Sequence, residues 1–147
     1  MNTPSLDVKG WMQTRLTLAH PHDGIDHARA LCERHRINQL PVVADGSLVG
    51  IVTDRDLRDA FPSVGEQVRH PGEARRETAA LRVEDVMTPN VLTVGERDPI
   101  ERAATIMREE RVGALPVVSG ERLVGIVTRT DLLGALVALA ATVRARA

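Results

Sequence analysis

The chain repeats one block of sequence at a fixed offset of 75 residues. Residues 50–57 read GIVTDRDL, and residues 125–132 read GIVTRTDL. Aligned without a gap, residues 25–57 and 100–132 share 15 identities in 33 positions. Self-similarity at one fixed period is the mark of a duplicated structural unit. The 147 residues are therefore expected to fold as two similar units.

An amphipathic helix is predicted in each copy, because apolar residues recur there at helical spacing. Asp23 and Asp98 stand just before these helices and are expected to cap them. Pro99 lies near a first-turn position that tolerates proline. The apolar positions are Ile25, Ala28, Leu31 and Cys32 in the first copy and Ile100, Ala103, Ile106 and Met107 in the second.

Short β-prone runs at 15–18 and 91–94 precede the helices, and the runs LPVV and LVGIV that follow them predict two buried strands. The Asp-Gly pair at 45–46 is a strong hairpin signal. A second helix is expected after Thr53 and after Thr128. Each unit is therefore predicted as β-α-β-β-α, a mixed α/β class. Since neither sheet can cover its apolar face alone, we expect the units to pack sheet against sheet about a pseudo-twofold axis.

These patterns place the first unit at 8–60, a surface linker at 61–82, the second unit at 83–139 and a C-terminal helical tail at 140–147. The linker holds prolines, glycines and many charges with weak periodicity. The sequence after residue 131 is Ala-rich, and its apolar stripe is expected to dock on this chain or on a second copy. The stripe consists of Leu132, Leu133, Leu136, Val137 and Ala140.

The composition excludes several classes of function. Nineteen basic and twenty acidic residues give a formal charge of −1, so neither nucleic acid nor an anionic membrane is an expected partner. A single cysteine permits no intrachain disulfide, and a reducing cytoplasm fits it. The N-terminus does not resemble a signal peptide, and no apolar run approaches the roughly 20 residues of a membrane span. We therefore expect a cytoplasmic protein.

Other chemically interesting residues have structural interpretations. Cys32 aligns with Met107 on the apolar helix face, which favours packing over nucleophilic chemistry. The histidines at 20, 22 and 27 lack metal-ligand spacing, and the two around Pro21 are expected in a solvated loop. Trp11 and Phe61 are predicted to pack rather than to stack on bases. No catalytic constellation, P-loop or dinucleotide fingerprint is recognised, so we expect no enzyme and no metal site.

The repeated pattern L-P-V-V, a turn, then L-V-G-I-V-T-x-x-D-L resembles a tandem pair of CBS (cystathionine β-synthase) domains, the Bateman module, over about residues 8–60 and 83–139. TDRDLRDAFPS, the long charged linker and GIVTRTDLLGAL are most similar to CBS pairs of the acetoin-utilisation type. Some of those carry a further C-terminal ligand-binding domain, which is not expected here. The resemblance implies a stand-alone regulatory module that binds an adenine nucleotide or adenosyl compound between its units and signals to a partner protein.

In that family the Thr and Asp of the repeated motif hold ribose, and groups of the early strands enclose adenine. The resemblance therefore implies two sites. One combines Ile51, Thr53 and Asp56 with Thr88, Leu92, Val112 and Gly113 of the second unit, and the other combines Ile126, Thr128 and Asp131 with Gln13, Leu16, Ile37 and Asn38 of the first. Because Gln13 stands where the second unit has Thr88, unequal affinities are expected. The resemblance also implies AMP or ATP as a regulatory ligand, no required cofactor, a homodimer and an unidentified regulated protein.

The chemistry of the motif suits ribose, since an ionised Asp offers two acceptor oxygens to two hydroxyls. Arg55 and Arg129 could neutralise a phosphate near the helix starts, and Arg36 and Arg111 are weaker candidates. However, Thr-x-x-Asp is also a helix-capping signal. The chemistry of the residues alone favours capping over ribose binding, and the family resemblance reverses that preference. Capping and ribose binding can coexist. The alternative function is a ligand-free structural or protein-interaction CBS pair.

Overall fold

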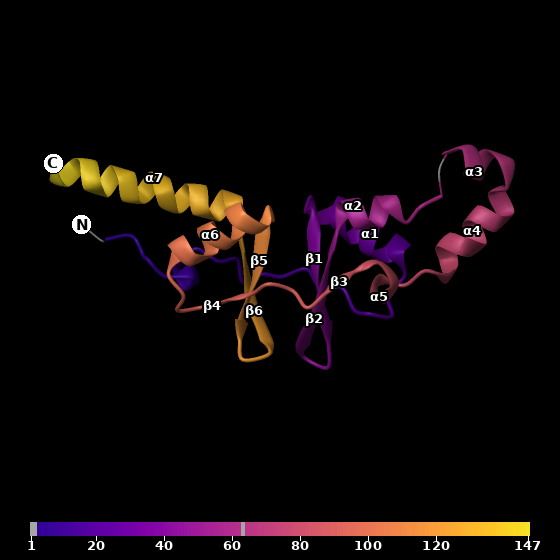
Figure 1. Ribbon diagram of the computed structural model, residues 1–147, viewed down its shortest axis with the longest axis horizontal. Helices are drawn as coiled ribbons and strands as arrows, with labels where there is room; N and C mark the ends of the chain where they lie inside the picture. The colour runs from indigo at the N-terminus through magenta and orange to yellow at the C-terminus, as the bar shows by residue number, and fades with distance from the viewer. Residues whose placement is uncertain (1–2, 63) are drawn as a thin grey trace. The chain divides into compact units, whose positions relative to one another are not determined.

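A computed structural model describes residues 3–62 and 64–147, the side chain of Val64 excepted. The chain divides into two compact units (Figure 1). One unit is Thr17–Val91, and the other joins the residues up to Leu16 with Leu92–Ala147.

The edges of the compact units differ from those of the sequence repeats. The amide of Val8 donates to the carbonyl of Asp98 at 2.9 Å, and Gln13 pairs with Ile126, so residues 8–16 belong with the second repeat. In the same way the amide of Val83 donates to the carbonyl of Asp23 at 2.8 Å. Backbone groups must find partners, and these segments find them on the opposite repeat.

The unit Thr17–Val91 contains an antiparallel hairpin with a third short strand on its side. Asp45 and Gly46, at φ 51° and 81°, form the tight turn that the Asp-Gly signal predicts. The β-prone run 15–18 is not a strand, because only Ala19 forms a single bridge, to Val42. The elements are α1 (Ile25–His35), β1 (Gln39–Ala44), β2 (Ser47–Thr53), α2 (Asp54–Asp59), α3 (Val64–Arg69), α4 (Pro71–Ala80), α5 (Val83–Val86) and β3 (Thr88–Pro89), which pairs with β2.

The other unit has the predicted β-α-β-β-α order. Its first strand is shorter than the run 91–94 suggests, because only Val94 and the following Gly95 pair, in parallel, with Val117 and Val118. The elements are a 3₁₀ turn η1 (Val8–Gly10), β4 (Val94–Gly95), α6 (Ile100–Glu110), β5 (Ala114–Ser119), β6 (Arg122–Thr128) and α7 (Arg129–Arg146). The mixed α/β class is thus confirmed, and the packing of sheet against sheet stays a prediction.

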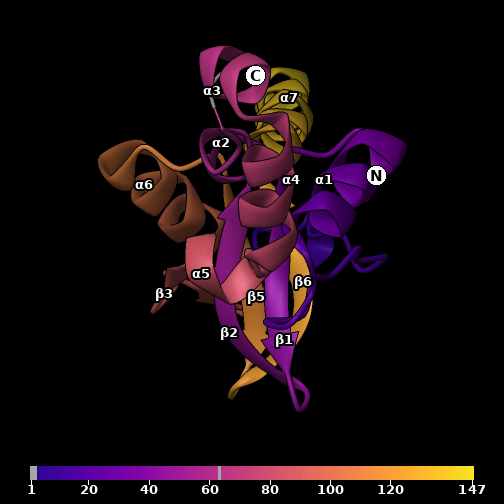
Figure 2. The ribbon, with the colours of Figure 1, turned by 90° about the vertical axis from the view of Figure 1, so that its right-hand side faces the viewer.

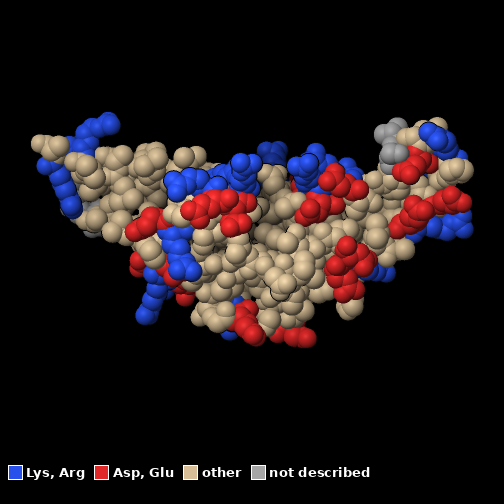
Figure 3. Space-filling model, viewed as in Figure 1, with Lys and Arg blue, Asp and Glu red and all other residues tan. Residues whose placement is uncertain are grey.

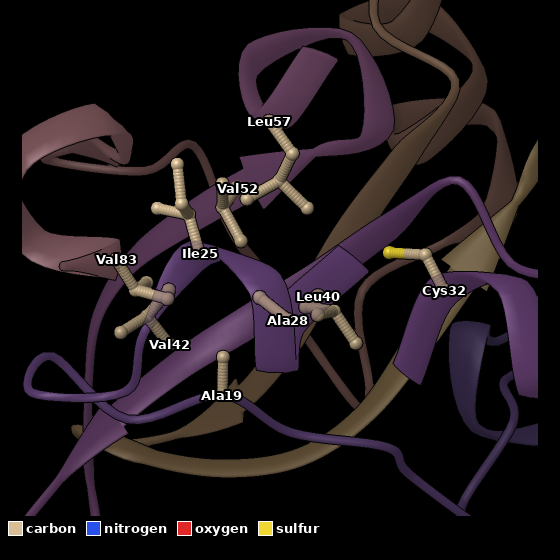
Figure 4. Packing of buried hydrophobic residues seen from close by; sticks show 9 residues of the cluster. All are labelled: Ala19, Ile25, Ala28, Cys32, Leu40, Val42, Val52, Leu57 and Val83. Atoms are coloured by element: carbon tan, nitrogen blue, oxygen red, sulfur yellow. The ribbon is translucent and has the colours of Figure 1, made fainter. Parts of the chain in front are cut away.

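Each unit has its own apolar core, in which the first helix of the repeat covers the hairpin. In Figure 4 the side chains of α1 face those of β1 and β2. Burying one such Leu or Ile side chain stabilises the fold by about 1.5–3 kcal/mol. The core of the other unit uses matching positions. The first cluster is Ala19, Ile25, Ala28, Cys32, Leu40, Val42, Val52, Leu57 and Val83, and the second is Val8, Val94, Ala103, Met107, Leu115, Val117 and Val127.

The predicted linker, whose residue 63 lies outside the described residues, folds into the helices α3 and α4. Ala74 of α4 is 7% exposed, and α4 lies beside α1 (Figure 2). At the end of α2, Phe61 packs on the core, with the guanidinium of Arg29 4.8 Å from its ring centre. Sequence analysis missed these helices because the apolar pattern is weak, Ala74 being the one residue of α4 that is buried.

The expected helix caps Asp23 and Asp98 have another role. Gly24 and Pro99 are the N-cap residues of α1 and α6, and neither makes a side-chain cap. Asp23 accepts from the amide of His20 at 2.8 Å, and Asp98 accepts from the amide of Gly95 at 2.8 Å. Both carboxylates therefore close the turn before the helix, because they stand one residue too early to cap it.

The C-terminal tail continues α7 as a single helix of 18 residues. Four of its large apolar side chains are well exposed in the single chain: Leu133 (61%), Leu136 (61%), Val137 (69%) and Val143 (70%). Docking on a second copy stays a prediction. None of the helices in the described part of the chain is both long and apolar enough to cross a membrane.

Candidate functional site

The first copy of the repeated motif forms a reciprocal cap at the start of α2. The amide of Asp56 donates to Oγ1 of Thr53 at 3.1 Å, and the amide of Thr53 donates to Oδ2 of Asp56 at 2.9 Å. This capping box satisfies two amides that the first turn leaves without partners. Both side chains are partly buried. The capping interpretation of Thr-x-x-Asp is thus confirmed for this copy.

The second copy forms the same cap at the start of α7 and adds a further bond. The amide and Oγ1 of Thr128 both donate to Oδ2 of Asp131, at 2.8 and 2.9 Å. The other oxygen, Oδ1, accepts from Nε2 of Gln13 at 2.8 Å. Both oxygens of Asp131 are therefore engaged by the protein itself.

The two aspartates differ at the oxygen that does not cap. In the described part of the chain, no group donates a hydrogen bond to Oδ1 of Asp56. A carboxylate has about four acceptor positions. Asp56 uses one of them and Asp131 uses three. The first copy therefore keeps its capacity to accept further hydroxyl donors.

A short crossing segment lies against the glycine of each motif. Thr88 pairs with Ile51 beside Gly50, and Gln13 pairs with Ile126 beside Gly125. The side chains before them, Met87 and Met12, pack directly on the two glycines. Sequence reasoning did not single out these methionines, although they match at the offset of 75 residues.

The structure brings together part of each predicted set of site residues. The carbonyl of Asn38 accepts from the amide of Asp54 at 2.7 Å, and the carbonyl of Gly113 accepts from the amide of Arg129 at 3.0 Å. Asn38 therefore lies at the first capping box and Gly113 at the second, whereas the family resemblance assigns Asn38 to the second site and Gly113 to the first. Thr88 is a residue of the second repeat, but it lies in the same compact unit as Thr53. The joining of residues from both units into one cleft stays a prediction, and it includes Leu16, Ile37, Leu92 and Val112.

The candidate arginines have other contacts. Nε of Arg55 lies 3.8 Å from Oδ2 of Asp59, and its side chain is 84% exposed. Arg129 lies beside Gly113 and lines an apolar groove along α6 and α7 together with Arg108 and Arg111. Arg36 and Arg111 follow α1 and α6 in the left-handed conformation, at φ 53° and 56°. Their backbones therefore end the helices.

Cys32, the one cysteine of the chain, is a buried residue of the first core. Burial raises the pKa of the Cys32 thiol, and the nearby charges of Asp54 and Glu33 raise it further. The thiol is therefore a packing group, as its alignment with Met107 indicates. Among residues 3–62 and 64–147, no group of three or more His, Cys, Asp and Glu side chains could hold a metal ion.

Two regions of the chain match the model of one known protein family. The model of the CBS domain matches the chain twice, at residues 7–63 and 83–138. The chain therefore belongs to the CBS-domain family, as a tandem pair. A CBS domain-containing protein of Dictyostelium discoideum is 39% identical over 133 residues, which cover 88% of this chain and 90% of that protein. The match to an inosine-5'-monophosphate dehydrogenase of Korarchaeum cryptofilum is 38% identical but covers only 20% of that enzyme.

Solved CBS pairs share the fold. CBSX2 of Arabidopsis thaliana, solved in complex with AMP, is 30% identical with a TM-score of 0.76 and covers 90% of this chain and 97% of that one. A CBS pair solved with 5-methylthioadenosine and S-adenosyl-L-methionine is 30% identical with a TM-score of 0.70, over 88% and 94% of the two chains. A Vibrio cholerae protein assigned to acetoin utilization is 26% identical, with a TM-score of 0.73, over 90% and 91%. The chain spans about half (47%) of a similar Methanocaldococcus jannaschii protein, with a TM-score of 0.79.

Proposed function

We propose that this protein is a regulatory module that binds an adenine nucleotide or a related adenosyl compound through the aspartate of its repeated motif. The observation that carries the proposal is the carboxylate of Asp56. Its Oδ2 closes the cap of α2, while its Oδ1 has no described donor. A ribose offers two hydroxyl donors to such an oxygen. Two CBS pairs that are 30% identical to this chain were solved with AMP and with adenosyl compounds, which supports the same ligand class here.

The proposed role is signalling rather than catalysis. A ligand that binds one arrangement of the protein more tightly shifts the population toward it, by as much as its differential affinity allows. That shift would be read by a regulated partner protein, with AMP or ATP as the regulatory ligand. The match to the dehydrogenase covers only a fifth of that enzyme, so it does not support the enzyme's activity for this chain. A cytoplasmic location stays a prediction.

Thermal unfolding with a panel of adenine nucleotides tests the proposal. A ligand at 100 times its Kd adds about 2.7 kcal/mol to stability, which raises the Tm by about 5–11 °C for a chain of this size. The Asp56→Asn variant keeps a side-chain oxygen that can accept from the amide of Thr53, but loses the charged second oxygen. We expect it to lose most of the ligand-induced shift, with a small decrease of the unliganded Tm because a negative charge leaves the first turn of α2. Asp45→Asn, in an exposed hairpin turn that favours Asn, is the matched control.

A ligand-free interaction module is the second candidate function, since helix capping by itself accounts for Thr-x-x-Asp in both copies. A wild type whose Tm responds to no adenine nucleotide or adenosyl compound would favour this candidate over the proposal.

We also infer that the protein forms a homodimer through α6 and α7. In the first repeat, α4 of the same chain covers the outer side of α1. In the second repeat, α6 and α7 line an open groove of about 620 Å³, whose walls are mostly apolar and also include Glu101, Arg108, Arg111 and Arg129. In Figure 3 most of the visible surface of α7 is uncharged up to its basic end. A helix with apolar residues on several faces is typically buried. Two copies of the chain can bury these apolar faces against each other, since α7 of each copy offers part of the groove and also exposed side chains that can enter the groove of the other copy.

A further inference from the structure

We propose that Gln13 blocks the ribose-binding carboxylate of the second motif, so that the chain has one adenosyl site of full affinity, at Asp56, instead of two. This inference rests on the proposed function. The observation is the hydrogen bond of 2.8 Å from Nε2 of Gln13 to Oδ1 of Asp131. A carboxylate only accepts, so the amide nitrogen of Gln13 must be the atom that faces it.

The backbone of Gln13 is held beside the second motif. Its amide donates to the carbonyl of Ile126 at 2.7 Å, and its carbonyl accepts from the amide of Ile126 at 3.0 Å. Ile126 lies two residues before Thr128, which begins the cap of α7. The glutamine is therefore fixed at the strand end from which its three-bond side chain reaches the carboxylate. With the backbone fixed, only the side-chain torsions of Gln13 have to be ordered when the bond forms.

The first motif has the same geometry with a shorter side chain. Thr88 pairs with Ile51 as Gln13 pairs with Ile126, and Ile51 lies two residues before Thr53. The threonine hydroxyl makes no hydrogen bond to Asp56 in the described part of the chain. The two repeats therefore differ at one matching position, which is Gln13 in one and Thr88 in the other. This difference explains why Asp131 accepts a hydrogen bond on Oδ1 and Asp56 does not.

A ribose at the second motif would have to displace Gln13 and leave its amide to find another partner. A ligand that must first break the hydrogen bond between Gln13 and the charged Asp131 is expected to bind about 10-fold more weakly or worse. With three acceptor positions of Asp131 engaged, the two hydroxyls of a ribose cannot both be accepted while Gln13 stays in place. Gln13 is therefore a residue that sets the number of ligands.

Isothermal titration with AMP, and in parallel with S-adenosyl-L-methionine, tests this assignment on the full chain. We expect one ligand per chain for the wild type and a second site in the Gln13→Thr variant. The reciprocal Thr88→Gln variant should weaken binding at the first motif by about 10-fold or more. Gln13→Ala is the second variant that frees Asp131, and Gln67→Thr, a substitution of an exposed glutamine on α3, is the matched control. Tm measurements check that each variant folds.

The outcomes separate this inference from the proposed function. A wild type that binds two ligands with equal affinity overturns the role of Gln13. The same conclusion follows if neither Gln13→Thr nor Gln13→Ala gains a site, whatever the wild type binds. If the wild type binds no ligand and Gln13→Thr binds one, the proposed site at Asp56 is wrong, but the blocking role of Gln13 is supported.

Discussion

Met87 packs on Gly50 so closely that its sulfur lies 2.6 Å from the position that a Cβ on this glycine would take. The carbonyl oxygen of Thr88 lies 3.0 Å from the same position. Met12 and Gln13 repeat this arrangement over Gly125, at 2.7 and 3.0 Å. The glycine of the repeated motif is thus required for the close approach of the crossing segment to the strand.

Gly50→Ala is therefore expected to destabilise the fold by about 1–3 kcal/mol, because the added methyl group overpacks this contact. Adding Met87→Ala should recover part of the cost but not all of it, since the backbone carbonyl of Thr88 cannot be removed. Gly72→Ala on α4 is the control, as its nearest neighbour would be 3.8 Å away. Urea unfolding measures all three variants. Equal stabilities of Gly50→Ala and wild type would contradict the close approach.

The capping boxes should contribute measurably to stability. Thr53→Ala and Thr128→Ala each remove the oxygen that accepts from the amide of the aspartate three residues on. The expected loss is about 1 kcal/mol for each variant, within the range of about 0.5–2 kcal/mol for helix caps. Thr→Ser at the same positions keeps the oxygen and should restore most of the stability. A Ser variant as unstable as the Ala variant would show that the methyl group of the threonine, and not its hydroxyl, is what matters.

The repeat made most of the fold predictable, because the same order of helix and strand patterns occurs twice, 75 residues apart. Each copy therefore supports the assignment of elements in the other. The hairpin at Asp45 and Gly46 and the helices after Thr53 and Thr128 are confirmed. The linker helices could not be predicted, since the one buried residue of α4, Ala74, is small and forms no apolar stripe. The caps at Asp23 and Asp98 were wrong by one residue, the usual scale of error at helix ends.

The candidate site was predictable only in part. Thr53, Asp56, Thr128 and Asp131 lie where the motif places them, at the starts of two helices. The difference between the two motifs depends on a hydrogen bond between residues 118 positions apart, and sequence periodicity carries no information about such a bond. The alignment of Gln13 with Thr88 indicated only that the two sites differ.

The helix α4 should behave as an integral part of its unit rather than as a free linker. Ala74→Gln places a larger polar side chain at a buried position against α1, with an expected cost of about 1–3 kcal/mol. Ala79→Gln on the exposed side of the same helix should change stability by no more than about 0.5 kcal/mol. Urea unfolding compares the two variants. Equal effects would show that α4 is not docked in solution.

The exposed face of α7 should control the oligomeric state. Size-exclusion chromatography with light scattering is expected to give a dimer for the wild type and a monomer for the double variant Leu133→Glu, Leu136→Glu. Because both side chains are 61% exposed in one chain, the substitutions should leave its folding intact, which circular dichroism checks. Val68→Glu, at a position that is 76% exposed on α3, is the control and should remain dimeric. A monomeric wild type would contradict the inferred homodimer.

Cys32 should make stability fall at alkaline pH. Burial raises the pKa of its thiol in the folded protein, so above about pH 8.5 the unfolded chain loses a proton that the folded chain still holds. The unfolded state then binds fewer protons, and stability decreases by up to about 1.4 kcal/mol per pH unit until the folded pKa is reached. The sequence contains no Tyr, and Lys9 is its one lysine, so few other side chains titrate there. Urea unfolding at pH 7, 8.5 and 10 should therefore show that the wild type loses stability as the pH rises. The Cys32→Ala variant should be less stable than the wild type at pH 7 but should lose little further stability at higher pH. The same loss in Cys32→Ala would assign it to other groups.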